Sequence, residues 1–385
     1  MAIYYSHFSD ISQKSRRNFL QVVLNFALKR VLDVNPFIYQ KLKREKEETM
    51  AEEKITIEKI LAPKKFMVFD SHAHPGLEKK GITERPGCFD FWRGDAISAR
   101  TLRGARAALG DPDPMKIINT PEECPEFSPE TWIKIMDASG VEAMCLQCIH
   151  GVSDPYPGNP EGWKWYVPNE YAKKEFIDAF PGRFTAVGGV HPRYGKQAAV
   201  EMVISAYENG FPGIKIHTPT SGPPNNPDLY PAYEKCQELG LHVQIHTGVE
   251  ELFGTRAKYQ DPVFVDDVAM DFPDVKILQL HCGAFNNPMI ALWNVMKHDN
   301  VYTDITVPHP TLMQFKYYWD LDHLRFMEFF MPDKVFFGTD FPLILSIYKF
   351  AIDYIMNLPL SQEFIHKLMG DNFRKFVNWK SSVNI

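Results

Sequence analysis

Short apolar runs recur along the chain from residue 66 onward, and most of them end in a histidine or an aspartate. The first run is too short for a typical helix and is stopped by Pro75-Gly76, so it is typical of a buried strand. The same reasoning predicts eight strands in all. They cover residues 66–72, 141–149, 184–191, 213–217, 242–246, 276–281, 301–306 and 335–340.

Segments with helical periodicity separate these runs. Many begin near a proline or end at a glycine, as helices do. They cover residues 128–139, 169–180, 196–209, 229–239, 263–272, 288–297, 321–330 and 362–376. Strands that alternate with helices indicate parallel βαβ units, and eight such units close into an α/β fold, the TIM (β/α)8 barrel. A doubly wound open sheet is the alternative, but no glycine-rich phosphate loop supports it.

Residues 1–65 precede the first predicted strand and form an N-terminal helical extension. Six apolar residues share one face of a predicted helix: Leu20, Val23, Leu24, Ala27, Leu28 and Val31. This face is expected to pack on the main domain or on a second subunit. The stretch 15–20 is similar to a twin-arginine export signal, but Lys29-Arg30 interrupts the apolar segment and no cleavage site follows.

A long polar section, residues 75–125, follows the first strand and is rich in glycine, proline and arginine. Long insertions at such places are more often functional than passive, so we expect a cap over a site; a solvated loop is the alternative. The predicted domains are therefore the extension, 1–65, and a barrel, 66–385, that carries this cap.

Composition narrows the class of protein. The 385 residues are 45% apolar and 23% charged, as in soluble globular proteins, and the net charge of −6 gives no basic surface for nucleic acid. No apolar stretch is long enough to cross a bilayer. Six cysteines are sparse for this length and indicate a reducing, cytoplasmic location. Cys145-Leu146-Gln147-Cys148 lies in an apolar run and is interpreted as core.

The strand ends carry the candidate chemistry. Alternation along the first strand places Asp70, His72 and His74 on one side, where two imidazoles can hold a divalent metal. Two structural histidines are the alternative for this motif alone. In a barrel, however, all strand ends meet at one mouth. The other strand-end candidates are His191, His217, His246, His281, Asp304 and Asp340.

Several local motifs resemble the amidohydrolase superfamily, and within it the amidohydrolase-related group that includes aminocarboxymuconate semialdehyde decarboxylase. The similarity runs from residue 66 to the C-terminus and covers the extension and the cap poorly. The motifs are Phe69-Asp70-Ser71-His72-Ala73-His74, Met136-Asp137-Ala138-Ser139-Gly140-Val141, Gly213-Ile214-Lys215-Ile216-His217, Ile245-His246-Thr247-Gly248, Leu280-His281-Cys282-Gly283 and Phe337-Gly338-Thr339-Asp340-Phe341-Pro342.

The resemblance implies one divalent metal, with zinc expected and manganese or another ion as alternatives. It implies His72, His74, His246 and Asp340 as ligands, and His281 as the residue that orients or deprotonates a metal-activated water. Chemistry agrees, because zinc suits imidazole and carboxylate ligands and lowers the pKa of water to about 7. Asp340 is then both a ligand and a proton acceptor.

Four further residues receive secondary roles. Some superfamily members carry a lysine at the position of Lys215 whose carbamate bridges two metals; here it is interpreted as structural or electrostatic. His217 is expected to face the substrate or support a ligand, and Asp70 to orient His72. Arg256 is a candidate clamp for a substrate carboxylate, which arginine binds with two hydrogen bonds.

Three functions follow for a small-molecule substrate. The first is a metal-dependent hydrolase that directs activated water at the carbonyl of an amide, ester or lactone. The second is a non-oxidative decarboxylase of an unsaturated or aromatic carboxylic acid, a reaction that members of the same group catalyse with nearly the same ligands. The third is a catalytically silent binder. A homodimer is also expected, because the apolar face in residues 20–31 needs a partner.

Overall fold

The computed structural model describes residues 68–75, 128–152, 154–155, 160, 162, 164–248, 254–306, 319–341 and 348–380. These residues belong to one unit of the chain, Lys64–Ile385. The predicted extension, residues 1–65, and nearly all of the predicted cap, residues 75–125, lie outside the described residues. The predicted domain boundaries therefore stay a prediction.

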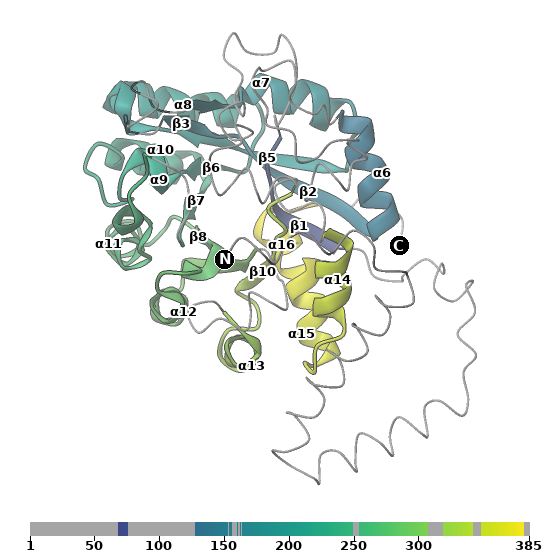
Figure 1. Ribbon diagram of the computed structural model, residues 1–385. Coiled ribbons are helices and arrows are strands. Elements are labelled where there is room, and N and C mark those ends of the chain that lie inside the picture. Colours follow the sequence, from purple (N-terminus) through teal and green to yellow (C-terminus); the bar gives the residue numbers. More distant parts are fainter. Residues whose placement is uncertain are drawn as a thin grey trace, which may run out of the picture. The chain divides into compact units, whose positions relative to one another are not determined.

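Eight parallel strands form one sheet whose order follows the sequence. They are β1 (Val68–Ala73), β2 (Val141–Gln147), β5 (Phe184–Val190), β6 (Gly213–Ile216), β7 (His242–His246), β8 (Ile277–Leu280), β9 (Val301–Ile305) and β10 (Val335–Phe337). The last strand returns to the first: Ala73 bridges Phe341, and the Asp340 N–H donates to the His72 carbonyl at 2.9 Å. The predicted TIM barrel is confirmed (Figure 1).

Helices follow the strands and surround the sheet (Figure 1). The longer ones are α6 (Pro129–Ser139), α8 (Lys196–Glu208), α10 (Tyr230–Leu239), α11 (Val263–Asp271), α12 (Pro288–Lys297), α13 (Leu321–Phe330) and α14 (Tyr348–Met356). Shorter elements are α7 (Asn169–Tyr171), which continues as a π-helix over Ala172–Asp178, and α9 (Thr218–Ser221). The chain ends its described part with α15 (Gln362–His366) and α16 (Asn372–Phe376).

Local sequence explains where these helices begin and end. At α6 the Ser128 side chain accepts the Thr131 N–H, and proline occupies the first helical turn. Gly140 then ends the helix with φ 73°, a left-handed conformation that glycine adopts without a steric cost. Among the described residues, no helix combines the length and apolar character needed to span a bilayer.

One hairpin departs from the predicted pattern. The strand predicted over 141–149 ends at Gln147, and the chain then forms β3 (His150–Val152) and β4 (Lys164–Tyr166), which pair antiparallel. These strands, His150-Gly151-Val152 and Lys164-Trp165-Tyr166, mix polar, glycine and apolar residues and form no apolar run, so the sequence pattern missed them. Helix α14 was missed as well.

The interior of the barrel is apolar near the amino ends of the strands. Phe69, Leu278 and Phe336 pack there with Phe373 and Phe376 of α16, which close that end. Cys145 belongs to this inner cluster, whereas Cys148 belongs to the larger cluster outside the sheet. Both are buried free thiols, which supports their interpretation as core.

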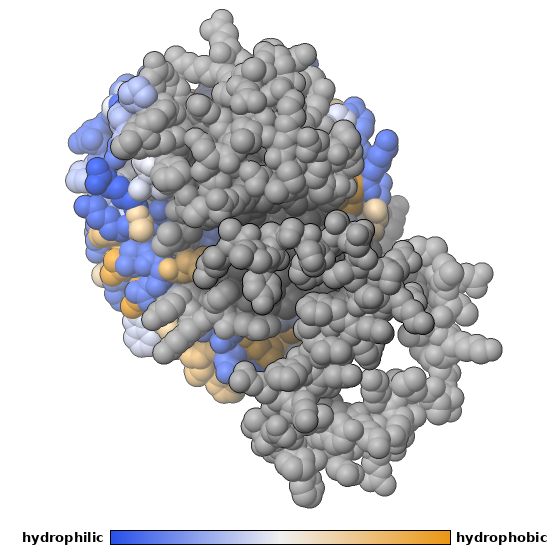
Figure 2. Space-filling model, in the orientation of Figure 1, coloured by the Kyte–Doolittle hydropathy of each residue, from blue (hydrophilic) through white to orange (hydrophobic). Residues whose placement is uncertain are grey.

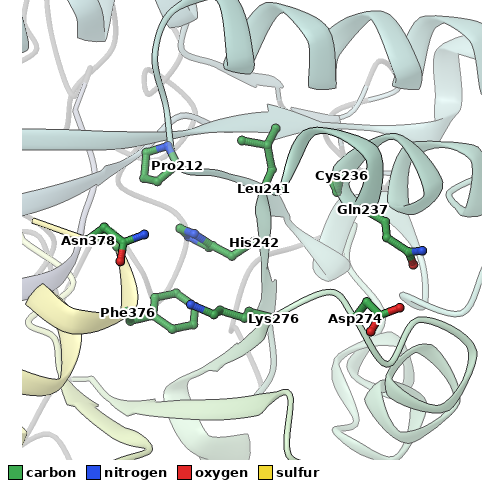
Figure 3. A pocket seen from close by; sticks show the side chains of 11 residues that line it. Pro212, Cys236, Gln237, Leu241, His242, Asp274, Lys276, Phe376 and Asn378 are labelled. Carbon is green, nitrogen blue, oxygen red and sulfur yellow. The ribbon is translucent and has the colours of Figure 1, made fainter.

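A pocket of about 270 Å³ opens at this amino end of the strands. Figure 3 shows His242 and Lys276 pointing into it beside Phe376, the first from β7 and the second from just before β8. The polar mouth that carries the candidate ligands is at the opposite, carboxyl end of the strands. The barrel thus separates this pocket from the candidate site.

Candidate metal centre

Three predicted ligands converge at the carboxyl end of the barrel. His72 and His74 come from the end of β1, and Asp340 follows β10, the neighbouring strand. One ligand atom from each lies within 4.8 Å of the others. The two Nε2 atoms are 3.1 Å apart, and Oδ1 of Asp340 lies 2.8 Å from His74 Nε2 and 3.5 Å from His72 Nε2.

These distances suit donors that share one cation. Tetrahedral bonds of about 2.0–2.1 Å to zinc place neighbouring ligand atoms about 3.3 Å apart. His72 and His74 are buried, and only 14% of the Asp340 side chain is exposed. Two imidazole nitrogens and a carboxylate oxygen in such a setting fit a divalent metal.

His246 and His281 stand beside this group. The ring centroids of the two residues are 4.4 Å apart, and His281 lies 4.7 Å from His72 by the same measure. The Nε2 atom of His246 is 3.1 Å from the Gly248 carbonyl, and His246 is not one of the three closely spaced residues. Its role as a ligand therefore stays a prediction.

Asp304 of β9 connects two of these histidines. Its Oδ2 lies 3.1 Å from Nδ1 of His72, and its Oδ1 accepts the His281 N–H at 2.6 Å. Thr306 extends the network, because its Oγ1 is 2.6 Å from His281 Nδ1 and 3.4 Å from Asp304 Oδ1. The sequence pattern indicated Asp304 as a further pocket candidate and did not include Thr306.

Asp70 supports the backbone rather than an imidazole ring. Its Oδ1 accepts the N–H groups of His72 and Thr339, both at 3.0 Å, and its other oxygen accepts the Thr339 hydroxyl. Because Thr339 immediately precedes Asp340, one carboxylate holds the two chain segments that carry the candidate ligands. Burial raises the pKa of Asp70 to about 7.

Two of the predicted site residues have an uncommon backbone conformation. Asp340 has φ 61° and His281 has φ 64°, and Cys282 after it has φ 48°. Residues other than glycine rarely adopt this left-handed region, and such strain persists where the surroundings enforce it. Here the backbone N–H of each residue is held, by His72 and by Asp304 respectively. Strain of this kind often marks a functional site.

Burial favours the neutral forms of His72, His74 and His246. Burial lowers the pKa of His72 and His246 well below its usual value, and the Lys215 and His281 charges lower it further. Burial also lowers the pKa of His74. Burial alone would raise the pKa of Asp340, but hydrogen bonding and attraction to His74 hold it below its usual value. Neutral imidazoles and an ionised carboxylate are the forms that bind metals.

Lys215, His217 and Arg256 are the remaining predicted site residues, and they differ in burial and in their partners. Lys215 is buried in β6. His217 follows it, with Nδ1 2.9 Å from Thr220 Oγ1 and its ring 5.3 Å from that of His246. Arg256 is 57% exposed and pairs with Asp154 at 3.1 Å. This surface ion pair engages the Arg256 guanidinium, which weakens the expected role of Arg256 as a substrate clamp.

The Amidohydrolase family model matches residues 166–379, more than half of the chain. The chain belongs to this family. The matched region contains His246, His281 and Asp340, whereas His72 and His74 precede it. The fold brings both parts to one place, since His72 and His74 lie beside Asp340.

Solved structures of other proteins share the fold of this chain. An uncharacterised TIM-barrel protein of Bordetella bronchiseptica is 19% identical with a TM-score of 0.60, over 82% of this chain and 99% of that one. The 5-carboxyvanillate decarboxylase of Novosphingobium aromaticivorans, solved with manganese and a nitrobenzoic acid, is 14% identical with a TM-score of 0.53, over 82% and 96%. A 2,6-dihydroxybenzoate decarboxylase is 14% identical with a TM-score of 0.51, over 81% and 98%.

Proposed function

We propose that this chain is a metal-dependent hydrolase that acts on the carbonyl group of a small molecule. The observation that carries the proposal is the convergence of His72 Nε2, His74 Nε2 and Asp340 Oδ1 within 2.8–3.5 Å of one another. His246 would complete the set of ligands. Zinc is the proposed ion because it suits imidazole and carboxylate donors, with manganese as the alternative.

When bound, a divalent metal would polarise a carbonyl oxygen and lower the pKa of water. The protein's own residues would then move protons. Because Nδ1 of His281 is engaged by Thr306, Nε2 of His281 would be the nitrogen that accepts a proton. Asp340 would hold a second proton, since its carboxylate is ionised in these surroundings.

A non-oxidative decarboxylase is the second candidate. It is favoured by the two decarboxylases of aromatic acids that share the fold at TM-scores of 0.53 and 0.51. Lys215 would contribute, since its buried charge acts on the ligands and would attract a substrate carboxylate. Arg256 is a weaker candidate for this task than the sequence indicated, because it is exposed and paired with Asp154.

Metal content and the fate of the substrate test these proposals. Elemental mass spectrometry of the purified chain should give about one divalent metal per chain. Panels of esters, lactones, amides and aromatic acids should then be assayed in ¹⁸O-labelled water. Label in the acid released from an ester, lactone or amide identifies hydrolysis, and release of carbon dioxide together with an organic product that carries no label identifies decarboxylation. A chain that takes up no metal after reconstitution would contradict both and would support a silent binder.

Two further proposals concern the whole chain. We propose that it forms a homodimer and that it works in the cytoplasm. The cytoplasmic location is supported by the four cysteines of the described residues, all of which are free and buried. Gel filtration with light scattering tests the homodimer, and cell fractionation tests the location.

A further inference from the structure

His191 lies at the mouth of the barrel, directly after β5. Val187 of β5 belongs to the cluster inside the sheet, whereas Val190 belongs to the cluster outside it. The backbone of His191 is still extended, with φ −139° and ψ 126°. Because side chains alternate between the two faces of a strand, His191 points into the barrel. Only 3% of the residue is exposed, and the mechanism proposed above gives it no task.

The imidazole of His191 has a hydrogen-bond donor to spare. Its Nδ1 accepts the Arg193 N–H at 3.0 Å, so the hydrogen of the neutral ring is on Nε2. Burial lowers the pKa of His191 to about 4, which keeps the ring neutral at pH 7. The Thr220 carbonyl raises this pKa slightly, but Nε2 makes no hydrogen bond within the part of the chain that the structure describes. Buried donors are normally paired, so this one is suited to an oxygen of a ligand.

Arg193 adds a positive charge beside this donor. It is exposed in the 3₁₀ turn Pro192–Tyr194, and its charge is close enough to lower the pKa of His191. Among the described residues no carboxylate pairs with its guanidinium, whereas Arg256 is paired with Asp154. Helix α8, which follows the turn, presents a mainly hydrophilic surface at the upper left of Figure 2. Arginine binds a carboxylate with two parallel hydrogen bonds, so Arg193 is a better candidate clamp than Arg256.

Acidic and basic side chains occupy opposite sides of the barrel. Asp70 and Asp304 belong to β1 and β9, and Asp340 follows β10. In the order of the sheet, β5 is four strands away from β9, and β6 is four strands away from β10. The residues of β5 and β6 that face inward include no acid, and their charged member is the buried Lys215. The β5–β6 side therefore favours an anion, opposite the side that would hold a cation.

The register of the sheet gives the scale of this arrangement. Val190 pairs with Ile216, and Ile216 pairs with Ile245. The residues that follow these partners form one row across three neighbouring strands: His191, His217 and His246. Neighbouring strands are about 4.8 Å apart, so the first and last members of the row are about 10 Å apart. A small molecule that reacts beside the last histidine can therefore present a second group to the first.

We propose that His191 and Arg193 bind a carboxylate of the substrate that takes no part in the reaction. The Nε2–H of His191 donates to one carboxylate oxygen, and the guanidinium of Arg193 clamps the same group. The inference rests on the proposed function, because the metal centre would hold the group that reacts. The substrate is then a small organic acid with a second functional group, a carbonyl for hydrolysis or another carboxylate for decarboxylation.

The experiment titrates the metal-loaded, full-length chain with adipate, which has two carboxylates, and with hexanoate, which has one. Calorimetry should show that the parent binds adipate at least about 10-fold more tightly, since hydrogen bonds to charged groups are strong. His191→Phe and Arg193→Gln should lose most of this preference and bind hexanoate like the parent. His191→Gln, which keeps an N–H donor, should retain part of it. Arg325→Gln is the control, because Arg325 is exposed on α13.

A ¹⁵N spectrum of the histidine-labelled chain supplies a readout that does not depend on activity. The Nε2 resonance of His191 is assigned by its loss in His191→Phe, and adipate should shift it while hexanoate should not. Such a shift in a chain that takes up no metal would refute the metal centre and keep the carboxylate site. Equal affinities of the parent for the two acids, or no adipate binding, would overturn the site. If His191→Phe does not fold by circular dichroism, the exposed Arg193→Gln decides.

Discussion

His72 Nδ1 lies 3.1 Å from Asp304 Oδ2, with both side chains fully buried. Burial raises the pKa of Asp304 to about 8, and a cation at the site would favour its ionised form. In that form Asp304 accepts the Nδ1 hydrogen and leaves the lone pair of His72 on Nε2, the atom nearest His74 and Asp340. The other oxygen of Asp304 accepts the His281 N–H. One side chain therefore fixes the tautomer of a proposed ligand and the position of the proposed base.

Asp304→Asn should weaken zinc binding by about 10–100-fold, because the amide cannot replace the carboxylate that orients His72. Competition against a chromogenic chelator measures the affinity. Asp299→Asn is the control, since Asp299 is exposed just before β9. Equal affinities in the two variants would show that Asp304 does not orient a ligand.

Replacement of the two neighbouring histidines should separate binding from turnover. His246→Ala is expected to lose the metal and the activity, whereas His281→Ala should keep the metal and lose about 100-fold or more of turnover. Elemental analysis, and kinetics on a substrate identified in the ¹⁸O assays, measure both. His366→Asn on the exposed side of α15 is the control. Full activity in either alanine variant would refute the assignment of the site.

The barrel could be predicted from the sequence because the strands of a barrel are buried on both faces. Such strands read as continuous apolar runs, and proline or glycine marks the ends of the helices between them. The ends of the same strands identified His72, His74 and Asp340 as candidates from the sequence alone. The hairpin of β3 and β4 was not predicted, since polar residues and a glycine interrupt both strands and leave no apolar run.

Hydrogen bonds between residues of different strands could not be predicted from local sequence patterns. The roles of Asp304 and Thr306 depend on the register of β8 against β9, which no local pattern specifies. Asp70 was expected to orient His72, and it accepts the backbone N–H groups of both His72 and Thr339, a link across strands that no local pattern specifies.

Removal of the metal should lower thermal stability. A ligand that binds only the folded chain stabilises it by about 2.7 kcal/mol at a concentration 100 times its dissociation constant. Chelation should therefore lower the Tm of the parent chain, and zinc should restore it. In His74→Gln the same treatment should change the Tm little. A parent Tm that is indifferent to chelation would contradict a metal bound to the folded chain.

His242 should make stability depend on pH. It lies in the pocket at the amino end of the barrel (Figure 3), with Nε2 3.0 Å from the Gln244 amide and its ring 4.7 Å from that of Phe376. Burial, with the charge of Lys276, lowers its pKa from 6.5 to about 3. The unfolded chain then binds the extra proton between these two pH values, so this contribution is complete above pH 6.5 and is lost as the pH falls toward 3.

The slope is at most about 1.4 kcal/mol per pH unit for one group. Urea unfolding of the parent chain and of His242→Asn between pH 4.5 and pH 7 measures it. The variant is expected to be less stable at neutral pH because it leaves a cavity, but its stability should fall less steeply with acid. Parallel curves for the parent and His242→Asn would mean that His242 does not carry this pH dependence.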